Sequence, residues 1–395
     1  MMIDFEPFKK KYLTSHNLVG RRFCFILGAG ASKTSGIPTG NELAHKWFCQ
    51  LVDDWKEPTE EWDDWIFILK SEDSNENRKK ALKLILKNEL LLDKILLNRK
   101  FGEDSTYDLA DFIKLKYIFG ISSNYGALAK ANFVDSMARD NEFQQILQGV
   151  TPSDGYRNLA EILSKTKHNI AITTNFDSLI FDSFANGNAS TLRLDSATDK
   201  CPGAFDTNDR LREDFTASGK RLIIKVHGDN SKGGLLNTVE ETRYLPDAFY
   251  NKIASIFNSY CPIFIGYSGG DLAFMDLLLR YADSNTFNSG FNTFWFVRND
   301  DTKEFPQAVV QFVRKTNGIF VYAPNGFDSV MRDMKQLLCP DIIPQKTGDK
   351  IDENRKEISD VGQTKIDPDD KKMDERKKYP FPIKNLTIPR RNNDG

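Results

Sequence analysis

The chain has 395 residues with 54 basic and 56 acidic side chains, a formal net charge of −2 at pH 7. This length allows one large or two ordinary domains. The balanced charge excludes a global field favouring nucleic acid or an anionic membrane, although a local basic patch stays open. No apolar run approaches the roughly 18 residues of a membrane span, and no signal-peptide core is evident, so we expect neither membrane insertion nor secretion.

The cysteines are odd in number, widely spaced and without a C-x-x-C pair: Cys24, Cys49, Cys201, Cys261 and Cys339. This pattern disfavours both a zinc ribbon and a disulfide framework, and it fits a reducing cytoplasm. We therefore expect a cytoplasmic, zinc-free protein.

Six short runs rich in β-branched and aromatic residues predict strands at 23–27, 170–173, 222–226, 263–266, 294–297 and 319–322. Each is apolar with little alternation, which is typical of strands buried on both faces. Helical patterns, such as 156–165 and 272–281, lie between them. We predict an α/β fold, a Rossmann-like parallel sheet of about six strands with helices on both faces.

The first two predicted strands are separated by about 130 residues of mainly helical character. We predict a helical insertion at 39–150, in which the leucines of 81–97 are broken by lysines at helical spacing and Thr39 with Glu42 forms a capping box at the start of the first helix. The main domain is predicted at 1–340. Residues 341–395, polar and then Pro-containing, predict a linker or disordered tail because they bury too little apolar surface.

A small polar cluster follows each of the first four predicted strands. The clusters are Gly28-Ala29-Gly30-Ala31-Ser32, Thr174-Asn175-Phe176-Asp177, His227-Gly228-Asp229 and Tyr267-Ser268-Gly269-Gly270-Asp271. The carboxyl ends of parallel strands meet at one edge of a sheet, where ligands bind. We therefore expect the four clusters to form one site.

Each cluster also has a simpler structural interpretation. The glycine-rich turn is either only a tight connection or a loop whose backbone amides bind phosphate. Lys33 stands in place of the third glycine of the dinucleotide motif, which argues against the helix packing of dehydrogenases. Asn175 and Asp177 either form an Asx turn or helix cap, or they orient water, a ribose hydroxyl or a bound amide.

His227 is either a structural histidine or a general base, and Asp271 is either a helix cap or part of a turn that closes over phosphate or ribose with Ser268. His16, His45 and His168 lack such a setting, and we expect them at the surface or in helices.

Taken together, these motifs resemble the sirtuin superfamily, and most closely the sirtuin-like NAD-cleaving domains of bacterial anti-phage defence proteins. GAGAS with SGIPT resembles the sirtuin opening motif, and TTNFD resembles the segment that contains the sirtuin Asn and Asp. HG resembles the pair of residues that contains the catalytic histidine, and GYS resembles the later cofactor turn. FVRND at 296–300 resembles the strand end that contacts adenosine. The resemblance runs from about residue 23 to residue 340.

Three departures concern the acyl-lysine groove. A four-cysteine zinc module is absent, Thr39-Gly40 follows the Gly-Ile-Pro turn where deacylases have Phe-Arg, and Thr174 replaces the usual Gln before the catalytic Asn. These departures favour water over an acyl-peptide as the acceptor.

The resemblance implies NAD+ as the substrate, with Asn175 and His227 as catalytic residues. The implied cofactor-binding residues are Gly28, Ala29, Gly30, Ala31, Ser32, Ile37, Pro38, Thr174, Asp177, Gly228, Gly266, Ser268, Asp271 and Arg298. The implied function is a regulated NAD+ glycohydrolase that depletes NAD+ in abortive infection. The resemblance also implies a homo-oligomer and a sensor domain or partner protein, such as an ATPase, Argonaute-like or repeat module. We expect no membrane association and no direct binding of nucleic acid.

Two other classes stay open: an NAD-dependent protein deacylase or ADP-ribosyltransferase, and a non-catalytic NAD or ADP-ribose sensor. A plain interaction module is a further alternative, and it would show no nucleotide affinity.

Overall fold

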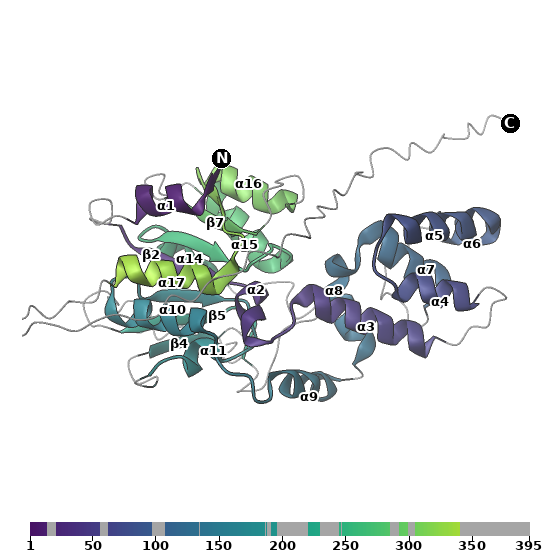
Figure 1. The fold of residues 1–395 in the computed structure, drawn as a ribbon, viewed down its shortest axis with the longest axis horizontal. Coiled ribbons are helices and arrows are strands. Elements are labelled where there is room, and N and C mark those ends of the chain that lie inside the picture. Colours follow the sequence, from purple (N-terminus) through teal and green to yellow (C-terminus); the bar gives the residue numbers. More distant parts are fainter. Residues whose placement is uncertain are drawn as a thin grey trace, which may run out of the picture. The chain divides into compact units, whose positions relative to one another are not determined.

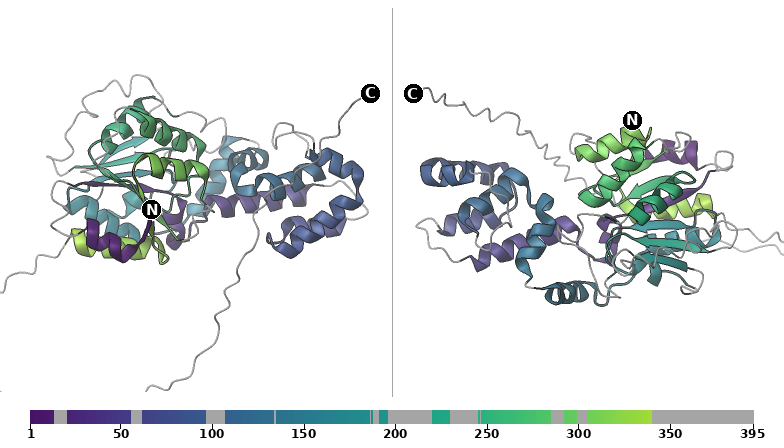
Figure 2. Two further views of the ribbon diagram at one scale, coloured as in Figure 1. Left: turned by 90° about the horizontal axis from the view of Figure 1, so that it is seen from above. Right: turned by 180° about the vertical axis from the view of Figure 1, so that it is seen from behind.

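The chain forms a parallel sheet with helices on both faces, as Figures 1 and 2 show for a computed structural model. The structure describes residues 1–13, 21–55, 62–96, 107–133, 135–185, 187, 191–195, 220–229, 245, 247–284, 292–298 and 305–339. All of them lie within the compact unit Met1–Ile342. The predicted tail and its boundary lie outside the described residues and stay a prediction.

Eight strands make up the sheet, in the order β1-β8-β7-β6-β2-β3-β5-β4. They are β1 (Met2–Asp4), β2 (Phe23–Leu27), β3 (Ile170–Thr173), β4 (Thr191–Asp195), β5 (Arg221–Lys225), β6 (Cys261–Ile265), β7 (Phe294–Val297) and β8 (Ile319–Tyr322). Every described pairing between neighbours is parallel. The predicted Rossmann-like fold class is confirmed, and two edge strands, β1 and β4, extend the sheet beyond the six predicted.

The order of the central strands is that of the doubly wound dinucleotide fold. From β2 the chain proceeds to β3 and β5 on one side, and then crosses to β6, β7 and β8 on the other. The strand order therefore reverses between β2 and β6. Open sheets of this kind bind ligands at such a switch point, beyond the carboxyl ends of the strands.

The two faces of the sheet bury separate apolar cores. Along β2, Phe23, Phe25 and Leu27 contribute to one core, and Cys24 and Ile26 contribute to the other, because successive side chains of a strand point to opposite faces. The first core is covered by α1 (Phe5–Tyr12), α10 (Asp154–Lys165), α11 (Leu179–Asp182) and α17 (Gly326–Leu338). The second is covered by α14 (Asp247–Phe257), α15 (Leu272–Asp283) and α16 (Gln307–Lys315).

A mainly helical insertion separates β2 from β3, as predicted. After α2 (Ala29–Ser32) and the 3-10 turn η1 (Lys33–Ser35), it comprises α3 (Gly40–Asp54), α4 (Trp62–Lys70), α5 (Asn75–Lys87), α6 (Glu89–Leu96), α7 (Leu109–Ile113), the π-helix η2 (Lys114–Phe119), η3 (Ile121–Asn124), α8 (Tyr125–Asn132) and α9 (Ser136–Leu147). Its own core contains Trp47, Phe48 and Phe112. The capping box of Thr39 and Glu42 is present at the start of α3.

The helical spacing noted at 81–97 does not form one continuous helix. The chain forms two helices there, α5 and α6, because Asn88 adopts an extended backbone with φ −121° and ψ 93°. The Asn88 side chain accepts a hydrogen bond from the amide of Leu91 at 2.9 Å and so caps the second helix. An asparagine side chain can compete in this way with the hydrogen bonds of a helical backbone. The spacing of leucines and lysines gives no sign of this break.

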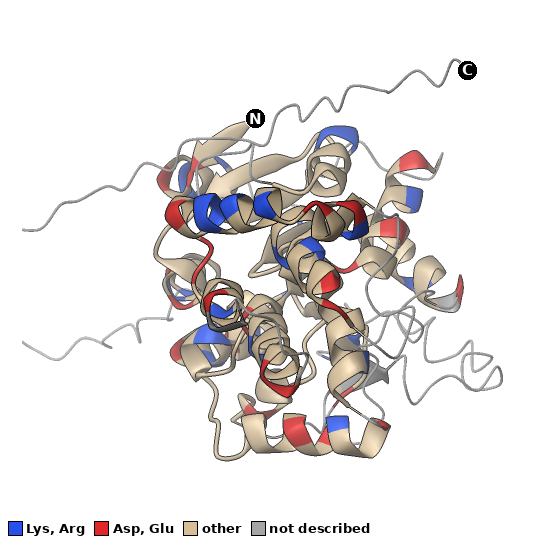
Figure 3. Ribbon diagram, turned by 90° about the vertical axis from the view of Figure 1, so that its right-hand side faces the viewer, with Lys and Arg blue, Asp and Glu red and all other residues tan. Residues whose placement is uncertain are grey.

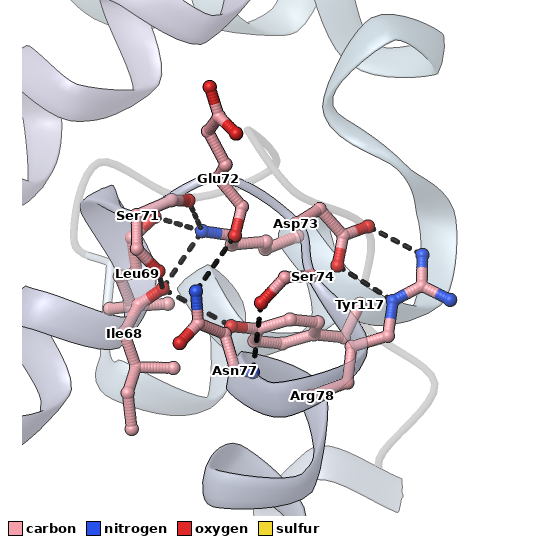
Figure 4. Close-up of polar contacts among 10 residues, drawn as sticks. Ile68, Leu69, Ser71, Glu72, Asp73, Ser74, Asn77, Arg78 and Tyr117 are labelled. Atoms are coloured by element: carbon pink, nitrogen blue, oxygen red, sulfur yellow. Dashed lines mark hydrogen bonds and ion pairs between the residues drawn. The ribbon is translucent and has the colours of Figure 1, made fainter. Parts of the chain in front are cut away.

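Polar contacts join α4, α5 and η2 within the insertion (Figure 4). Asp73 pairs with the guanidinium of Arg78 through both carboxylate oxygens, and Tyr117 donates to the carbonyl of Ile68 at 3.2 Å. Lys116 donates to the carbonyls of Ile68 and Ser71 at 2.9 and 2.6 Å, close to the C-terminal end of α4. Burial lowers the pKa of Lys116 to about 8. A cation near helix C-terminal carbonyls is favourable, which gives this buried lysine a structural role.

Acidic and basic segments are interspersed over the described helices (Figure 3), in keeping with the balanced net charge. The most basic of these helices, α5, carries Arg78, Lys79, Lys80, Lys83 and Lys87. Two of these charges have acidic neighbours, since Arg78 pairs with Asp73 and Lys80 with Glu76. No helix among the described residues is long and apolar enough to cross a membrane.

The prediction that His168 lies at the surface or in a helix is wrong. It is 2% exposed, between α10 and β3, and its Nδ1 accepts a hydrogen bond from the amide of Phe23 at 2.9 Å. His45 lies on α3 as expected, and His16 lies outside the described residues. Burial, with Lys167 and Arg22 nearby, lowers the pKa of His168 to about 3.

The depressed pKa of His168 predicts a loss of stability in acid. Because the folded pKa lies below the unfolded value of about 6.5, the unfolded chain binds the proton first as the pH falls from 6.5 towards 3. Between pH 7.5 and pH 5 the free energy of unfolding should fall by about 2 kcal/mol more in the wild type than in His168→Asn, whose Oδ1 keeps an acceptor for Phe23. Urea unfolding at both pH values measures the difference, and equal losses in the two proteins would contradict the assignment.

Candidate active site

Four loops meet at the carboxyl edge of the central strands. They follow β2, β3, β5 and β6 and contain the four polar clusters of the sequence. Hydrogen bonds join the loops across the sheet edge: Asn175 to Gly28, Gly30 to Gly266, and Lys225 to the main-chain oxygen of Asp177. The structure thus brings the clusters into one connected region at the switch point.

The two glycine-rich loops approach each other closely. The amide of Gly30 donates to the carbonyl of Gly266 at 2.9 Å, and that of Gly28 donates to the carbonyl of Ile265 at 3.2 Å. A Cβ on Gly28 would lie 2.5 Å from the Gly266 oxygen, and a Cβ on Gly266 would lie 2.3 Å from the amide nitrogen of Ala31. Glycine is therefore required here for contact between two loops of the protein.

Several amides of the opening motif already have protein acceptors. Besides Gly28 and Gly30, the amide of Ala31 donates to the Gly28 carbonyl at 2.9 Å. A phosphate bound at this loop would need donors other than these three. The proposed phosphate contact of the loop stays a prediction.

Asn175 is held firmly through its amide nitrogen. Nδ2 donates to the Gly28 carbonyl and to Ser32 Oγ, both at 3.0 Å, and lies 3.4 Å from the hydroxyl of Tyr156. Its main-chain amide donates to Thr173 Oγ1 at 3.0 Å. No described residue donates to its side-chain oxygen, so this acceptor is the part of Asn175 that is open to a ligand.

Ser32, Asp177 and Tyr156 form a buried network behind Asn175. Ser32 Oγ donates to Asp177 Oδ2 at 2.7 Å and lies 2.8 Å from the Tyr156 hydroxyl. The other oxygen of Asp177 accepts from the amide of Leu179 at 3.2 Å. Burial raises the pKa of Asp177, an effect that nearby Lys225 opposes, and burial raises the pKa of Tyr156 well above its usual range. Both oxygens of Asp177 therefore have protein donors, and the network fixes the amide of Asn175.

His227 lies past the end of β5, and Asn175 lies past the end of the neighbouring strand β3. Thr173 and Lys225 are register partners on adjacent parallel strands, and Asn175 and His227 each lie two residues further on. Both residues therefore lie in the loops that leave two neighbouring strands at the carboxyl edge. His227 is 5% exposed, and its Nε2 contacts Asp271 Oδ2. The following Gly228 has φ +89°, a left-handed conformation that favours glycine.

Asp271 has two partners. Besides His227, it caps α15, because Oδ1 accepts from the amide of Phe274 at 3.1 Å. The helix-cap interpretation of this residue is thus observed, together with a histidine contact that the sequence did not indicate.

The other predicted binding residues lie at varying depth. Ala29, Pro38 and Thr174 are half-buried and Ile37 is buried, whereas Ser268 and Arg298 are exposed, the latter directly after β7. Thr174 donates its amide to the Leu27 carbonyl at 3.1 Å. Asn299 and Asp300 of the FVRND segment lie outside the described residues. Contact of these side chains with NAD+ stays a prediction.

Sequence reasoning missed two residues of the network, Tyr156 and Lys225. Lys225 is fully buried and lies 3.5 Å from Asp229 Oδ2, also fully buried. A lysine within the apolar strand run LIIKV was the available signal, because an unpaired buried charge is very unfavourable and needs an acidic partner. Tyr156, on the buried face of α10, gave no comparable signal.

A pocket of about 280 Å³ lies in the insertion, away from these four loops in the sequence. Its polar lining includes His45, Asp73 and Lys116. Asp73 pairs with Arg78, and Lys116 donates to main-chain carbonyls. These two charged residues of the pocket therefore already have partners. Among the described residues there is no group of three or more His, Cys, Asp or Glu side chains that would hold a metal ion, and the expectation of a zinc-free chain stays a prediction.

The doubly wound strand order and the polar residues at its switch point define a Rossmann-like α/β protein with a candidate nucleotide site. Within this fold, residues 169–321 match the family model described as the SIR2-like domain. SIR2-like domains use NAD+, so the match supports a place in the sirtuin-like superfamily and is consistent with an NAD-related function. Asn175, His227 and Asp271 lie inside the matched residues. No curated protein matches the chain.

Proposed function

We propose that this chain is an NAD+ glycohydrolase that releases nicotinamide and ADP-ribose, or a cyclic form of it. The observation that supports this proposal best is the position of Asn175 and His227 past the ends of two neighbouring strands, β3 and β5, at the switch point of a Rossmann-like sheet. The SIR2-like match over residues 169–321 points to the same ligand.

The residues present suit this chemistry. The nicotinamide of NAD+ is cationic and leaves without a general acid, so the protein must stabilise positive charge on the ribose and place a nucleophile. The open side-chain oxygen of Asn175 orients the attacking water, since the Asn175 nitrogen is held by Gly28 and Ser32. His227 polarises a ribose hydroxyl or accepts the proton of the nucleophile.

The remaining assignments follow from the resemblance. Gly28, Ala29, Gly30 and Ser32, with Ser268, hold the pyrophosphate and ribose, and Asp177 anchors the nicotinamide carboxamide. Because Asp177 and Ser32 also bond each other, we assign them in addition the task of fixing the Asn175 amide. The other residues assigned to this pocket are Ala31, Ile37, Pro38, Thr174, Gly228, Gly266, Asp271 and Arg298.

The test is nicotinamide release from NAD+ by purified protein, measured by chromatography. We expect turnover by the wild type and a loss of at least about tenfold in Asn175→Ala, because a misplaced nucleophile strongly reduces rate. The matched control is Asn132→Ala, which removes an amide that donates to the carbonyls of Trp47 and Leu128 in the insertion. Absence of turnover in every assembly state, or full activity of Asn175→Ala, would refute the proposal.

The same assay separates the alternatives. A deacylase or ADP-ribosyltransferase would consume NAD+ faster when acyl-peptide or an acceptor protein is added. A non-catalytic sensor would bind NAD+ or ADP-ribose in calorimetry without turnover. An interaction module would bind neither.

We further propose that the activity is a regulated effector of anti-phage defence. Uncontrolled hydrolysis of NAD+ would kill the cell, so such a domain must be held inactive until a signal arrives. This reasoning implies a homo-oligomer and a sensor domain or partner. Turnover measured together with the mass of the assembly tests the link between oligomer and activity.

A further inference from the structure

The contact between His227 and Asp271 crosses the centre of the sheet edge. His227 follows β5, whereas Asp271 follows β6, and the strands β2 and β3 lie between β5 and β6 in the sheet. The two residues are 44 positions apart in sequence. The contact therefore spans the carboxyl ends of the two strands that carry the opening motif and Asn175.

Asp271 is well placed to fix the histidine, because its own position is fixed. One carboxylate oxygen accepts from the amide of Phe274 and caps α15. That helix is anchored by buried Phe274, Met275 and Leu278. The second oxygen contacts His227 Nε2, and both ends of the pair are largely buried, with side-chain exposures of 6% and 16%.

This contact determines which ring nitrogen carries the proton. An ionised carboxylate only accepts hydrogen bonds, so Nε2 must be the donor, and in the neutral ring Nδ1 then holds the lone pair. Nδ1 is buried and has no hydrogen-bond partner among the described residues. The nitrogen that is free to accept a proton is therefore Nδ1.

We propose that Asp271 is a positioning residue that holds His227 in the Nε2-protonated tautomer and so makes Nδ1 the proton acceptor of the reaction. The inference rests on the proposed function for its catalytic part. In that reaction the C–N bond to nicotinamide breaks with its electron pair going to the leaving group, and water oxygen forms the new bond to the ribose carbon. The proton of that water passes to His227 Nδ1, and Asp271 stabilises the imidazolium until the proton reaches solvent.

Asp271→Asn separates this role from helix capping. Asparagine caps helices as well as aspartate does, and its oxygen would keep the bond to the Phe274 amide. Its NH₂ group would then face Nε2 as a donor, which forces the ring proton to Nδ1. The control is Asp135→Asn, the same change at an equivalent cap, where Asp135 accepts from the amide of Ala138 at 2.8 Å.

The first readout does not depend on activity. The chain has only four histidines, so ¹⁵N-histidine labelling gives few ring signals, and His227→Ala identifies that of His227. We expect long-range ¹H–¹⁵N spectra near pH 7.5 to show the Nε2–H tautomer in the wild type and in Asp135→Asn, and the Nδ1–H tautomer in Asp271→Asn. A wild-type Nδ1–H tautomer, or no change in Asp271→Asn, would overturn the proposal.

The second readout is the rate of nicotinamide release. Asp271→Asn should lower kcat at least about 100-fold with KM changed less than about threefold, because binding groups stay in place while the acceptor is blocked. A fall no larger than that of Asp135→Asn would overturn the catalytic part. If the wild type shows no turnover but the tautomer still changes as expected, NAD+ hydrolysis fails while the positioning role of Asp271 stands.

Discussion

Replacing His227 by alanine is expected to lower kcat for nicotinamide release about 100- to 1,000-fold. General base catalysis by a positioned histidine contributes about 10²- to 10⁴-fold. His227 is buried at the carboxyl edge of the sheet, where Asn175 follows the neighbouring strand. Removal of the ring also leaves Asp271 without its partner at this edge. Chromatographic assay of nicotinamide at saturating NAD+ measures the effect.

His45→Ala is the matched control for this variant. His45 lies half-buried on α3 and is not among the residues that join the four loops. We expect His45→Ala to keep kcat within about threefold of the wild type. A loss of stability alone does not change the kcat of the molecules that stay folded. Comparable losses in the two variants, or full activity of His227→Ala, would remove His227 from the mechanism.

Gly266→Ala is expected to lower the free energy of unfolding by about 3 kcal/mol and to abolish binding of ADP-ribose. Gly266 has φ +67°, where a side chain costs about 1–2 kcal/mol, and its new Cβ would lie 2.3 Å from the amide nitrogen of Ala31. Ala31 and Ser32 are fully buried, so α2 has no space to move away. Relief of the clash must instead move the loop after β6 away from α2, and these two segments form the proposed pyrophosphate site.

Gly149→Ala isolates the steric part of this effect. Gly149 has a similar φ of +73°, but its Cβ would have no atom within 4 Å. This control should therefore lose only about 1–2 kcal/mol and bind ADP-ribose normally. Urea unfolding gives the stabilities and calorimetry gives the affinities; equal losses in the two variants would contradict the proposed loop contact.

The strands of this fold were predictable where they are buried on both faces. Runs such as FCFIL and FWFV contain too many consecutive apolar residues for a surface element, and parallel sheets covered by helices demand such runs. The edge strands β1 and β4 escaped prediction for physical reasons. MID is only three residues long, and TLRLD alternates apolar with polar residues, so neither segment carries the buried-strand pattern.

Local sequence was less informative where one side chain decides the backbone. Asn88 ends α5 and caps α6 within a stretch whose leucines keep helical spacing on both sides of it. His168 was expected at the surface or in a helix because it does not follow a predicted strand as His227 does, yet it receives a hydrogen bond from the amide of Phe23 of β2. In both cases a hydrogen bond made by one side chain fixes a local structure that the neighbouring residues did not indicate.

The sequence by itself determined which chemical groups end the central strands, because polar residues placed directly after buried strands of a parallel sheet must gather at one edge. Only the tertiary structure decided how these groups pair: Asp271 with His227, Ser32 and Tyr156 with Asn175, and Lys225 with the carbonyl of Asp177. The partners lie 19 to 143 residues apart in sequence. A hydrogen bond requires its two atoms to be placed to within a few tenths of an ångström, which spacing along the chain does not encode. The residue types in the sequence therefore indicate that a site is present. The orientation of Asn175 and the choice of which nitrogen of His227 is protonated follow from tertiary packing.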